Sequence, residues 1–404
     1  MDHPTHPRDS YPLYAEDLFT KEALLNPFPH YAAIREMAPV VRLEEPDVLA
    51  IARYHDVVKA LQTADVLISG QGTGFNSFIN QKVPEPGVLN SDGERHRRMR
   101  MPLMKHLSPA ALGPMRANMV SMIDDHVGAL ANGETIDGVW DLASFLPSEA
   151  VSGLVGLPEE DRAKMVRWSS ASFNVLGVIE KDGKVIPELE EDLATAAEVM
   201  NYIRNIDPTK LKENSWSAQL FERVRAGGMS LADARVSLRA FVLPSLDTTI
   251  NAMSNLLFNL ATHPDQYDLV RKDPSLIPSA VYEGMRHTSI IRWFSRVAAR
   301  DYSEGEVFIP EGRRVMILFG AANRDPRKYP DPDRFDVTRN PVDQLTWSAG
   351  PHLCAGKYLA RMEMEALLEA LVKHVKRIEM DEPTPILNRG AYGYAALPMR
   401  LIAG

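Results

Sequence analysis

The sequence predicts a mostly α-helical fold with small peripheral β-sheets. Apolar residues recur at helical spacing over several long segments, whereas strand-like alternation is confined to a few short runs. No fixed-period repeat, low-complexity tract or Gly/Ser linker divides the 404 residues. With 45% apolar and 25% charged residues, the chain has globular composition and is long enough to bury a large core. We therefore expect one folded domain over residues 1–404.

Three helical segments are expected in chain order. A basic helix covers about residues 95–106, and the sequence Ser-Asp-Gly-Glu at 91–94 before it has the form of a capping box. A second helix follows the expected N-cap Ser230 and continues to about Thr262, which is near 50 Å at about 1.5 Å per residue. Pro244 inside it predicts a kink. The third helix covers about residues 356–376.

Short strands are expected at the edges of this helical body. Their alternating apolar residues are too few for a central sheet. The expected strands are Val40–Leu43, Val48–Ala52, Val307–Ile309, Arg314–Leu318 and Leu397–Ile402, and Arg296 also lies on an expected strand.

Charge and cysteine content exclude several classes of protein. The chain has 54 acidic and 45 basic residues, a formal net charge of −9, which argues against a general nucleic-acid binder. Its one cysteine excludes an internal disulfide and a multi-cysteine metal site. The longest run without charged residues, Thr248–Pro264, is too short and too polar for a bilayer span, and the N-terminus lacks a signal-peptide pattern. We expect a cytoplasmic protein.

The segment from Trp347 to Gly356 carries the strongest functional signal. Cys354 stands two residues before Gly356, which opens the last predicted helix, and a helix N-terminus favours thiolate over thiol. Gly350 and Gly356 allow backbone to approach a flat ligand, and His352 can donate to an acidic group on it. A single thiolate presented in this way suits an axial ligand to haem iron, although a lone cysteine is more often an inert core residue.

This segment resembles the haem-binding signature of the cytochrome P450 family, Phe-Gly-x-Gly-x-His/Arg-x-Cys-x-Gly followed by an Ala-Arg pair. The chain departs from it at Trp347, where the family has Phe, and at Ser348, where it has Gly. The matching residues are Gly350, His352, Cys354, Gly356, Ala360 and Arg361. The resemblance covers nearly the whole chain and implies the triangular P450 fold, with haem b between the long central helix and the helix after the cysteine.

Three further motifs fall in the order that the family requires. Glu283 and Arg286 form an E-x-x-R pair on one helix face; alone such a pair is usually solvated, but in the family it is a buried structural pair that braces the loop leading to the cysteine. Residues 321–339 are similar to the family's meander. The pair Asp247 and Thr248 matches the family's acid-alcohol pair above the iron, with Pro244 and Ser245 in place of small residues.

The resemblance implies roles for these residues and for a set of cations. Thr248 hydrogen-bonds dioxygen and Asp247 helps to relay protons, although Asp-Thr within a helix often simply faces solvent. The haem propionates are bound by His96, Arg100, Arg296 and His352. A local positive patch on the cysteine side suits an acidic ferredoxin, although solubility explains most charge runs; it comprises Arg95, Arg97, Arg98, Arg100, Lys105 and Lys357.

By family position, an apolar and partly aromatic set lines the substrate pocket, although each member can equally be ordinary core. These residues are Phe75, Phe78, Val88, Leu89, Phe173, Leu176, Ala240, Leu243, Ile291, Phe294, Gly390 and Ala391. The set fits a small hydrophobic molecule. The central helix and meander are similar to those of bacterial enzymes that demethylate methoxylated aromatic acids. Candidate carboxylate-binding residues are Lys82, Arg239 and Arg292. A neutral phenolic or methoxy-aromatic fits as well as a benzoate, and a terpenoid is the alternative.

The implied activity is a monooxygenase that hydroxylates or O-demethylates such a substrate. The chain has no flavin motif and no room for a fused reductase. Electrons are therefore expected from NAD(P)H through a separate ferredoxin reductase and ferredoxin, with the protein acting as a monomer. A non-turnover haem-thiolate sensor and a peroxide-driven haem enzyme are alternatives, and the presence of Asp247 and Thr248 weighs against both. A haem-free helical lyase has no supporting metal motif.

Overall fold

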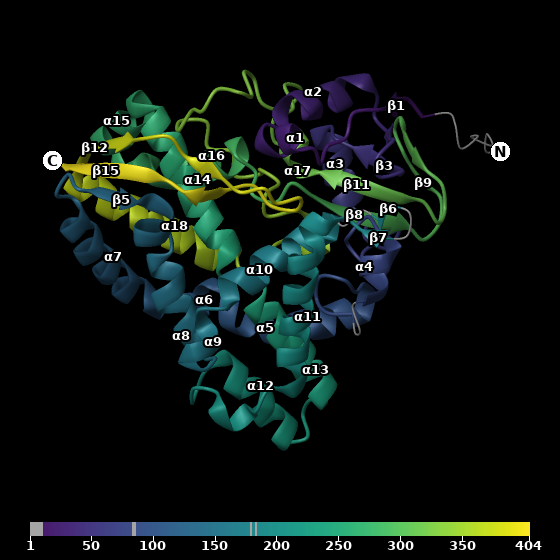
Figure 1. Ribbon diagram of the computed structural model, residues 1–404, viewed down its shortest axis with the longest axis horizontal. Helices are drawn as coiled ribbons and strands as arrows, with labels where there is room; N and C mark the ends of the chain where they lie inside the picture. The colour runs from purple at the N-terminus through teal and green to yellow at the C-terminus, as the bar shows by residue number, and fades with distance from the viewer. Residues whose placement is uncertain (1–10, 83–85, 178–179, 182–183) are drawn as a thin grey trace.

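The computed structural model describes residues 11–82, 86–177, 180–181 and 184–404. Helices form most of its body and small sheets lie at its edges, which confirms the expected fold class (Figure 1). In this view the outline narrows from the sheets at the top to α12 (Trp216–Arg225) and α13 (Leu231–Val242) at the bottom, giving a triangular shape. Among the described residues, no helix has both the length and the apolar character needed to cross a bilayer.

Helices account for most of the regular structure. The remaining α-helices are α1 (Lys21–Leu25), α2 (Phe28–Met37), α3 (Tyr54–Gln62), α4 (Ser77–Lys82), α5 (Gly93–Leu107), α6 (Pro109–Leu112), α7 (Arg116–Leu130), α8 (Ser152–Val155), α9 (Glu159–Arg162), α10 (Met165–Asn174), α11 (Glu190–Asn205), α14 (Asp247–Thr262), α15 (Pro264–Lys272), α16 (Ile277–His287), α17 (Phe319–Ala322) and α18 (Lys357–His374). Two π-helical segments are η2 (Gly138–Ala143) and η3 (Pro147–Val151). The 3-10 segments are η1 (Gly113–Met115), η4 (Val175–Gly177), η5 (Pro187–Leu189), η6 (Pro208–Lys210), η7 (Pro274–Leu276) and η8 (Gly350–His352).

The largest sheet has six strands in the order β1-β2-β3-β11-β8-β4. Its strands are β1 (Leu13–Tyr14), β2 (Val41–Leu43), β3 (Val48–Ile51), β4 (Leu67–Ile68), β8 (Trp293–Ala298) and β11 (Arg314–Leu318). β11 is parallel to β3 and antiparallel to β8, with Met316 opposite both Ala50 and Ser295. The smaller sheets are formed by β5 (Thr135–Asp137), β12 (Val375–Met380) and β15 (Pro398–Ala403); β9 (Tyr302–Glu304) and β10 (Val307–Ile309); β13 (Thr384–Pro385) and β14 (Tyr394–Ala396); and β6 (Glu180–Lys181) and β7 (Lys184–Val185).

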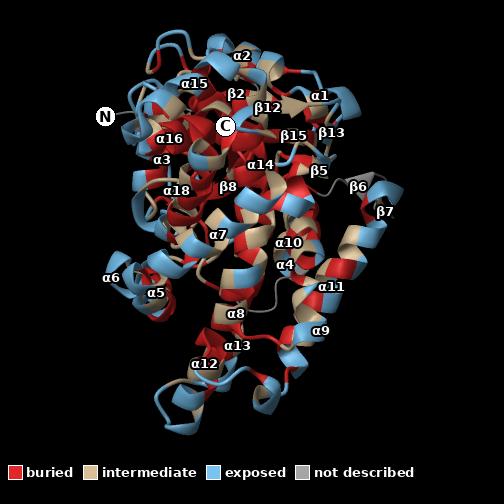
Figure 2. Cartoon of the chain, turned by 90° about the vertical axis from the view of Figure 1, so that its left-hand side faces the viewer, coloured by how far each residue is buried: buried red, intermediate tan, exposed pale blue. Residues whose placement is uncertain are grey.

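The core consists of apolar clusters on the sheet faces and a larger cluster among the helices. Along β11, Val315 and Ile317 join one cluster while Met316 and Leu318 join another, as the two-residue period of a strand requires. The helical cluster includes most of α14, which is red with buried residues in Figure 2. The sheet therefore positions Arg296 of β8, and the helical core positions α14 and α18.

The expected continuous helix from Ser230 to Thr262 is interrupted, so this part of the prediction was wrong. Ser230 is the N-cap, and its side chain accepts a hydrogen bond from the Asp233 N–H, but α13 ends at Val242 and α14 begins only at Asp247. Pro244 lies in the gap. A proline has no N–H to donate, and its ring clashes with the carbonyl four residues earlier, which explains why the expected kink is a full break.

The expected capping box at residues 91–94 is also absent. α5 begins at Gly93 without a side-chain cap. The Ser91 hydroxyl donates instead to the Gly87 carbonyl over 2.7 Å, and the Asp92 carboxylate accepts the N–H groups of Ser69 and Gly70. Both side chains are therefore used outside the helix cap, and the two Asp92 contacts hold the start of α5 against the segment after β4.

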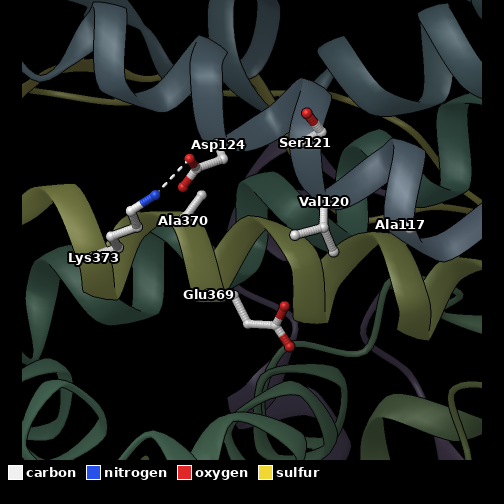
Figure 3. A pocket seen from close by; sticks show the side chains of 7 residues that line it. All are labelled: Ala117, Val120, Ser121, Asp124, Glu369, Ala370 and Lys373. Atoms are coloured by element: carbon white, nitrogen blue, oxygen red, sulfur yellow. Dashed lines mark hydrogen bonds and ion pairs between the residues drawn. The ribbon is translucent and has the colours of Figure 1, made fainter.

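α7 and α18 pack side by side and leave a surface groove of about 320 Å³ between them (Figure 3). The Lys373 ammonium lies 2.6 Å from Asp124, whose other carboxylate oxygen is 2.9 Å from His374 Nε2. Glu369 pairs with Arg116 at 2.5 Å. Because its charged side chains are already paired, the groove serves the packing of the two helices.

Candidate functional site

The loop before α18 is fixed by backbone hydrogen bonds and by a buried indole. The Cys354 N–H donates to the Trp347 carbonyl over 2.8 Å. Trp347 is buried, its ring lies edge-on to Tyr282 at a centroid distance of 5.7 Å, and the Lys357 ammonium is 5.3 Å from the indole centroid. The tryptophan that replaces the family's phenylalanine therefore packs beneath the cysteine loop.

Two residues of this loop adopt left-handed backbone conformations. Gly350 has φ +66°, and a Cβ there would lie 2.3 Å from the Leu61 carbonyl oxygen, so only glycine fits. Gly350 therefore lets the loop approach α3, and this contact explains the glycine without the flat ligand that the sequence suggested. Ser348 has φ +65°, a conformation that costs a residue with a side chain about 1–2 kcal/mol. The loop holds Ser348 in a strained conformation.

The Cys354 side chain keeps accessible surface although protein atoms surround it, so it is not close-packed. Burial raises the pKa of its thiol. The N–H groups of Gly356 and Lys357 and the charges of Arg100 and Lys357 act in the opposite direction, because they stabilise the sulfur anion. The surroundings can therefore support a thiolate once its charge is shared with a metal.

His96 of α5 and His352 of the loop lie together near this cysteine. Their ring centroids are 4.3 Å apart, and His352 Nε2 is 3.6 Å from the Asp92 carboxylate. Burial lowers the pKa of His96 to about 4 and also lowers the pKa of His352, an effect that the Asp92 charge opposes. His96 Nε2 is buried without a hydrogen-bond partner in the part of the chain that the structure describes.

Two arginines complete this group. Arg296 of β8 is buried, and its guanidinium donates to the Ser295 carbonyl over 2.8 Å. No carboxylate of the described residues lies within ion-pair distance of it, and burial lowers its pKa to about 10. Arg100 donates to the Leu353 carbonyl at 2.5 Å and so ties α5 to the cysteine loop. A buried guanidinium without a carboxylate favours an anionic ligand.

The break before α14 presents an alcohol and a carboxyl group. The Thr248 hydroxyl donates to the Pro244 carbonyl over 2.8 Å. Asp247 is only 6% exposed, and its Oδ2 has no hydrogen-bond partner within the described ranges; the same is true of the Ser245 hydroxyl. Burial raises the pKa of Asp247 to about 7, while a hydrogen bond from Asn251 acts against this rise. A carboxyl group with this pKa can exchange protons near neutral pH.

Comparison with known proteins identifies the family. The family model described as Cytochrome P450 matches residues 204–399. The chain is 31% identical over 391 residues to cytochrome p450 CYP199A2 of Rhodopseudomonas palustris, covering 95% of this chain and 93% of that protein. The chain belongs to the cytochrome P450 family. It is also 31% identical over 367 residues to the Beta-dihydromenaquinone-9 omega-hydroxylase of Mycobacterium tuberculosis, covering 91% of this chain and 74% of that enzyme.

Solved structures agree with this family assignment. The cytochrome P450 enzyme CxnD, for C-S bond formation in chuangxinmycin biosynthesis, superposes with a TM-score of 0.82 at 26% identity over 99% of this chain and 100% of that one. CalO2 superposes with a TM-score of 0.79 at 27% identity, over 96% and 99%. The protein is thus a cytochrome P450 monooxygenase, an oxidoreductase whose family uses haem, O2 and an external electron supply.

The residues around Cys354 fit the P450 haem. Cys354 offers an accessible sulfur next to two backbone N–H groups, as an axial ligand requires. Among the described residues, buried His96 Nε2 has no hydrogen-bond partner and buried Arg296 has no carboxylate within ion-pair distance, although the charge of Asp92 acts on both. They could therefore serve the two propionates. His352 and Arg100 lie beside them but have protein partners in Asp92 and the Leu353 carbonyl, respectively.

The E-x-x-R pair of this P450 lies at the centre of a buried network. Arg286 donates to Glu283 through Nε at 2.7 Å and Nη2 at 2.8 Å, and neither residue is exposed. Arg286 also donates to the Asn323 and Pro332 carbonyls, while Glu283 accepts the Asp336 N–H. Because all of these partners are backbone atoms of residues 323–336, the pair fixes the meander that leads to the cysteine loop.

The expected substrate-pocket residues fall into three groups. Phe173, Leu176, Ile291 and Ala391 are brought together: Ile291 bridges Ala391, and Gly390 and Gly74 lie against the backbones of Phe173 and Leu176. Phe294 packs nearby with the cluster of Ile291. Val88, Ala240 and Leu243 contact the helical core. Phe75 instead packs between Phe19 and Trp293, and Leu89 is 41% exposed, while the side chains of Phe78 and Lys82 lie outside the described residues.

Arg292, a candidate for binding a substrate carboxylate, already donates its hydrogen bonds to main-chain carbonyls. Its guanidinium donates to the carbonyls of Asn388, Ala391 and Leu24 and is buried. It therefore anchors the C-terminal loop instead of facing a ligand. Arg239 lies against Gly87, where a Cβ would meet its guanidinium at 2.6 Å.

A row of amide side chains that the sequence analysis missed continues from Asp247 along α14. Asn251, Asn255 and Asn259 follow at four-residue spacing, and all three are buried. Asn255 donates to the Tyr392 carbonyl over 3.1 Å, and Asn259 donates to Thr288 over 2.9 Å. A Cβ at Gly393 would lie 1.9 Å from Asn251 Oδ1. The row fastens α14 to the C-terminal loop and to the end of α16.

Proposed function

We propose that this P450 inserts one oxygen atom of O2 into a small hydrophobic aromatic substrate, by hydroxylation or by oxidative O-demethylation. The observation that carries the proposal is the apolar cluster that Phe173 and Phe294 form with Ile291, which bridges Ala391, together with the acid-alcohol pair of α14. Haem bound at Cys354 supplies the activation of O2. The Asp247–Thr248 pair weighs against the sensor and the peroxide-driven alternatives.

In this proposal the chain's own residues hold the reactants and move protons. Arg296 and His96 would neutralise the propionates, and Cys354 would supply the thiolate that holds the haem iron. Thr248, whose hydroxyl donates to the Pro244 carbonyl, can rotate to donate toward dioxygen at the break in the helix. Asp247 holds a proton at its unpartnered Oδ2 and passes it toward Thr248. Replacing Thr248 with Ala should therefore raise peroxide release per NADH consumed, whereas unchanged coupling would refute this role.

The commitment of Arg292 to three carbonyls removes one of the three candidate carboxylate-binding residues and so favours a neutral methoxy-aromatic or phenol over a benzoate, with Arg239 and Lys82 as the remaining candidates. Optical titration with a neutral methoxybenzene, its benzoate and an isoprenoid alcohol tests this preference, since a ligand that displaces the axial water changes the spin state. We expect the neutral aromatic to bind most tightly and to release formaldehyde on turnover with a reductase system. Tightest binding of the benzoate would overturn the neutral-substrate proposal.

Isoprenoids are the second candidate class. One relative is a Beta-dihydromenaquinone-9 omega-hydroxylase, whose substrate carries an isoprenoid chain, and the apolar cluster of Phe173, Ile291 and Phe294 suits such a chain as well. Tightest binding and hydroxylation of the isoprenoid alcohol in the same titration would favour this class over aromatics.

We also propose an acidic ferredoxin, reduced by NAD(P)H through its reductase, as the electron donor to the monomeric protein in the cytoplasm. Met101 is 72% exposed on α5, and Leu353, tied to α5 by Arg100, is also exposed. Lys105 and Arg98 are exposed on the same helix, although Arg98 pairs with Asp233 at 3.8 Å. Arg97 pairs with Glu94, and Arg95 donates to the Pro86 carbonyl. Met101→Glu should weaken ferredoxin binding through charge repulsion, and unchanged binding would contradict this surface.

A further inference from the structure

A cavity of about 590 Å³ lies among η2, η3, α10, the start of α14 and β14. Its volume is within the range of about 300–1,000 Å³ that is typical of sites for small molecules. Its lining extends from Trp140, which is 51% exposed, to the buried Asp247. Of the residues expected in the substrate pocket, none that the structure describes lines it, and neither Cys354 nor Thr248 does. The cavity is therefore separate from the expected substrate pocket.

Two aromatic side chains of the lining are held in place by the protein. The Trp140 indole N–H donates to the Ala395 carbonyl over 3.0 Å, which fixes the ring at the outer part of the cavity. Tyr394 is buried, and its ring stacks on Phe258 at a centroid distance of 4.8 Å. Further apolar surface comes from Val139, Val166, Ile250 and Ile386. Fixed aromatic rings beside aliphatic surface suit a flat aromatic molecule.

The cavity is also lined by two arginines, of which Arg162 keeps its terminal nitrogens available. Arg162 is half-buried and donates through Nε to the Leu157 carbonyl over 3.0 Å. Its two terminal nitrogens have no partner in the ranges that the structure describes. Arg167 instead pairs with Glu198 at 2.6 Å. Because two nitrogens of a guanidinium match the two oxygens of a carboxylate, Arg162 favours a ligand that carries a carboxylate.

Two acids line the cavity away from these arginines. Asp192 accepts a hydrogen bond from the Asn174 amide at 2.5 Å, whereas Asp247 Oδ2 is buried without a partner among the described residues. The pKa of Asp247 responds to burial and to Asn251, and that of Asp192 to burial, Asn174 and Glu191, so neither arginine acts on either acid. A buried oxygen without a partner favours a ligand that donates a hydrogen bond.

We propose that this cavity is a second ligand site of the enzyme and binds a small hydroxyaryl carboxylate. The carboxylate pairs with Arg162, the ring lies against Trp140 and Tyr394, and the hydroxyl group donates to Asp247 Oδ2. A ligand with only one of these polar groups leaves either Arg162 or Asp247 unpaired, which is why the class carries both. The site goes beyond the proposed function, because its ligand is bound without being oxidised.

Calorimetric titration of the holoenzyme with para-hydroxyphenylpropanoate tests the site. A phenylimidazole, whose imidazole nitrogen ligates the haem iron, is bound first so that the probe cannot occupy the substrate pocket. We expect the probe to bind, and Arg162→Gln to weaken its binding by about tenfold or more, because the carboxylate loses its charged partner. Arg225→Gln, at an exposed position of α12 outside the cavity, should bind the probe as wild type does. No binding to wild type, or equal binding to wild type and Arg162→Gln, would overturn the site.

A second pair of variants tests the location without changing the arginine. Ser148 lines the cavity, so Ser148→Leu fills part of it and should weaken probe binding by about tenfold or more. Glu149→Leu places the same side chain at the exposed neighbouring position and should leave binding unchanged. Equal affinity of wild type and Ser148→Leu would show that the probe binds elsewhere.

Two analogues of the probe test its polar ends on the wild-type protein. The methyl ester lacks the charge and the methyl ether lacks the hydrogen-bond donor, so each should bind about tenfold more weakly or worse. An ether that binds as tightly as the probe would overturn the contact with Asp247. These measurements need no turnover: probe binding to an enzyme that oxidises none of the tested substrates would support the site and contradict the proposed function, and absent binding to an active enzyme would do the reverse.

Discussion

The cysteine side and the α14 side of the site are stabilised in different ways. On the cysteine side, backbone contacts fix the loop: Cys354 bonds to Trp347, Arg100 bonds to Leu353, and Gly350 lies against Leu61. On the α14 side, the break leaves Ser245 and the Asp247 carboxyl oxygen buried without partners among the described residues. The rigid side suits holding a metal ligand in place, and the unpaired polar atoms suit groups that must exchange protons.

The largest effect is expected where the cysteine side is most tightly constrained. Gly350→Ala places a Cβ 2.3 Å from a carbonyl oxygen at φ +66°, and the combined clash and strain should lower the free energy of unfolding by about 3 kcal/mol. Denaturant unfolding measures this loss. Gly113→Ala is the matched control, because its φ is −48° and nothing lies within 4 Å of the added Cβ. A stable Gly350→Ala variant would show that the loop is less constrained than its contacts indicate.

On the α14 side the expected effect is on catalysis and not on folding. Asp247→Asn keeps the shape of the side chain but removes its exchangeable acid proton, so product formation should fall about 100-fold, within the range of general acid catalysis. Steady-state product formation per haem measures this. The unfolding free energy should stay the same or rise, because an ionisable group is removed from a buried position. A variant with wild-type product formation would remove Asp247 from the proposed mechanism.

A buried acid on the cysteine side, Glu363, should make the free energy of unfolding depend on pH, and this effect is expected to be of intermediate size. Glu363 of α18 is fully buried, both of its carboxyl oxygens lack partners in the described part of the chain, and burial raises its pKa to about 8. Because the folded-state pKa lies above the usual 4.5, stability is greatest below about pH 4.5 and is lost as the pH rises toward 8.

Glu363→Gln tests this pH dependence. The substitution should flatten the fall in unfolding free energy between pH 5 and 8 by at most about 1.4 kcal/mol per pH unit. Denaturant titrations at several pH values measure the slope. Glu369→Gln, on the same helix but at the surface, should leave the slope nearly unchanged. Parallel slopes for wild type and Glu363→Gln would contradict the assigned cause.

The smallest expected effect is a gain in stability. Ser348→Gly relieves a side chain held at φ +65° and should raise the unfolding free energy by about 1 kcal/mol, while a glycine also adds entropy to the unfolded chain. Thermal unfolding of the holoenzyme measures the change. If Ser348→Gly lowers the melting temperature, the contacts of the serine outweigh its strain.

The sequence predicted the parts of the fold that local patterns control. Period-2 alternation located β3 and β11, and the spacing around Cys354 located the loop before α18. It did not predict the full break at Pro244, because a proline inside a helical pattern is compatible with either a kink or a break. The six-stranded sheet order pairs β11 with strands far apart in the chain, which no local pattern encodes.

Within the site, the sequence suggested candidate residues, but it did not predict which other residues they would contact. Arg100 hydrogen-bonds to Leu353 of the cysteine loop, and His352 of that loop lies against His96, while the haem-binding roles of these residues and of Arg296 stay predictions. Asp92 was interpreted only as part of a capping box, because its contacts with Ser69, Gly70 and His352 are all non-local. Asn251 had a detectable signal, since it is the first of three asparagines at four-residue spacing after Asp247 on an otherwise apolar helix.

These asparagines have a consequence for how the enzyme can diversify. Asn255 donates a hydrogen bond to the main-chain carbonyl of Tyr392 in the C-terminal loop, and Asn251 packs against Gly393 of the same loop. Neither contact depends on the side chains that the loop carries. Substitutions in this loop can therefore change which molecules the enzyme accepts, while α14 and its Asp247 keep their position. Selectivity and oxygen chemistry are thereby free to evolve separately.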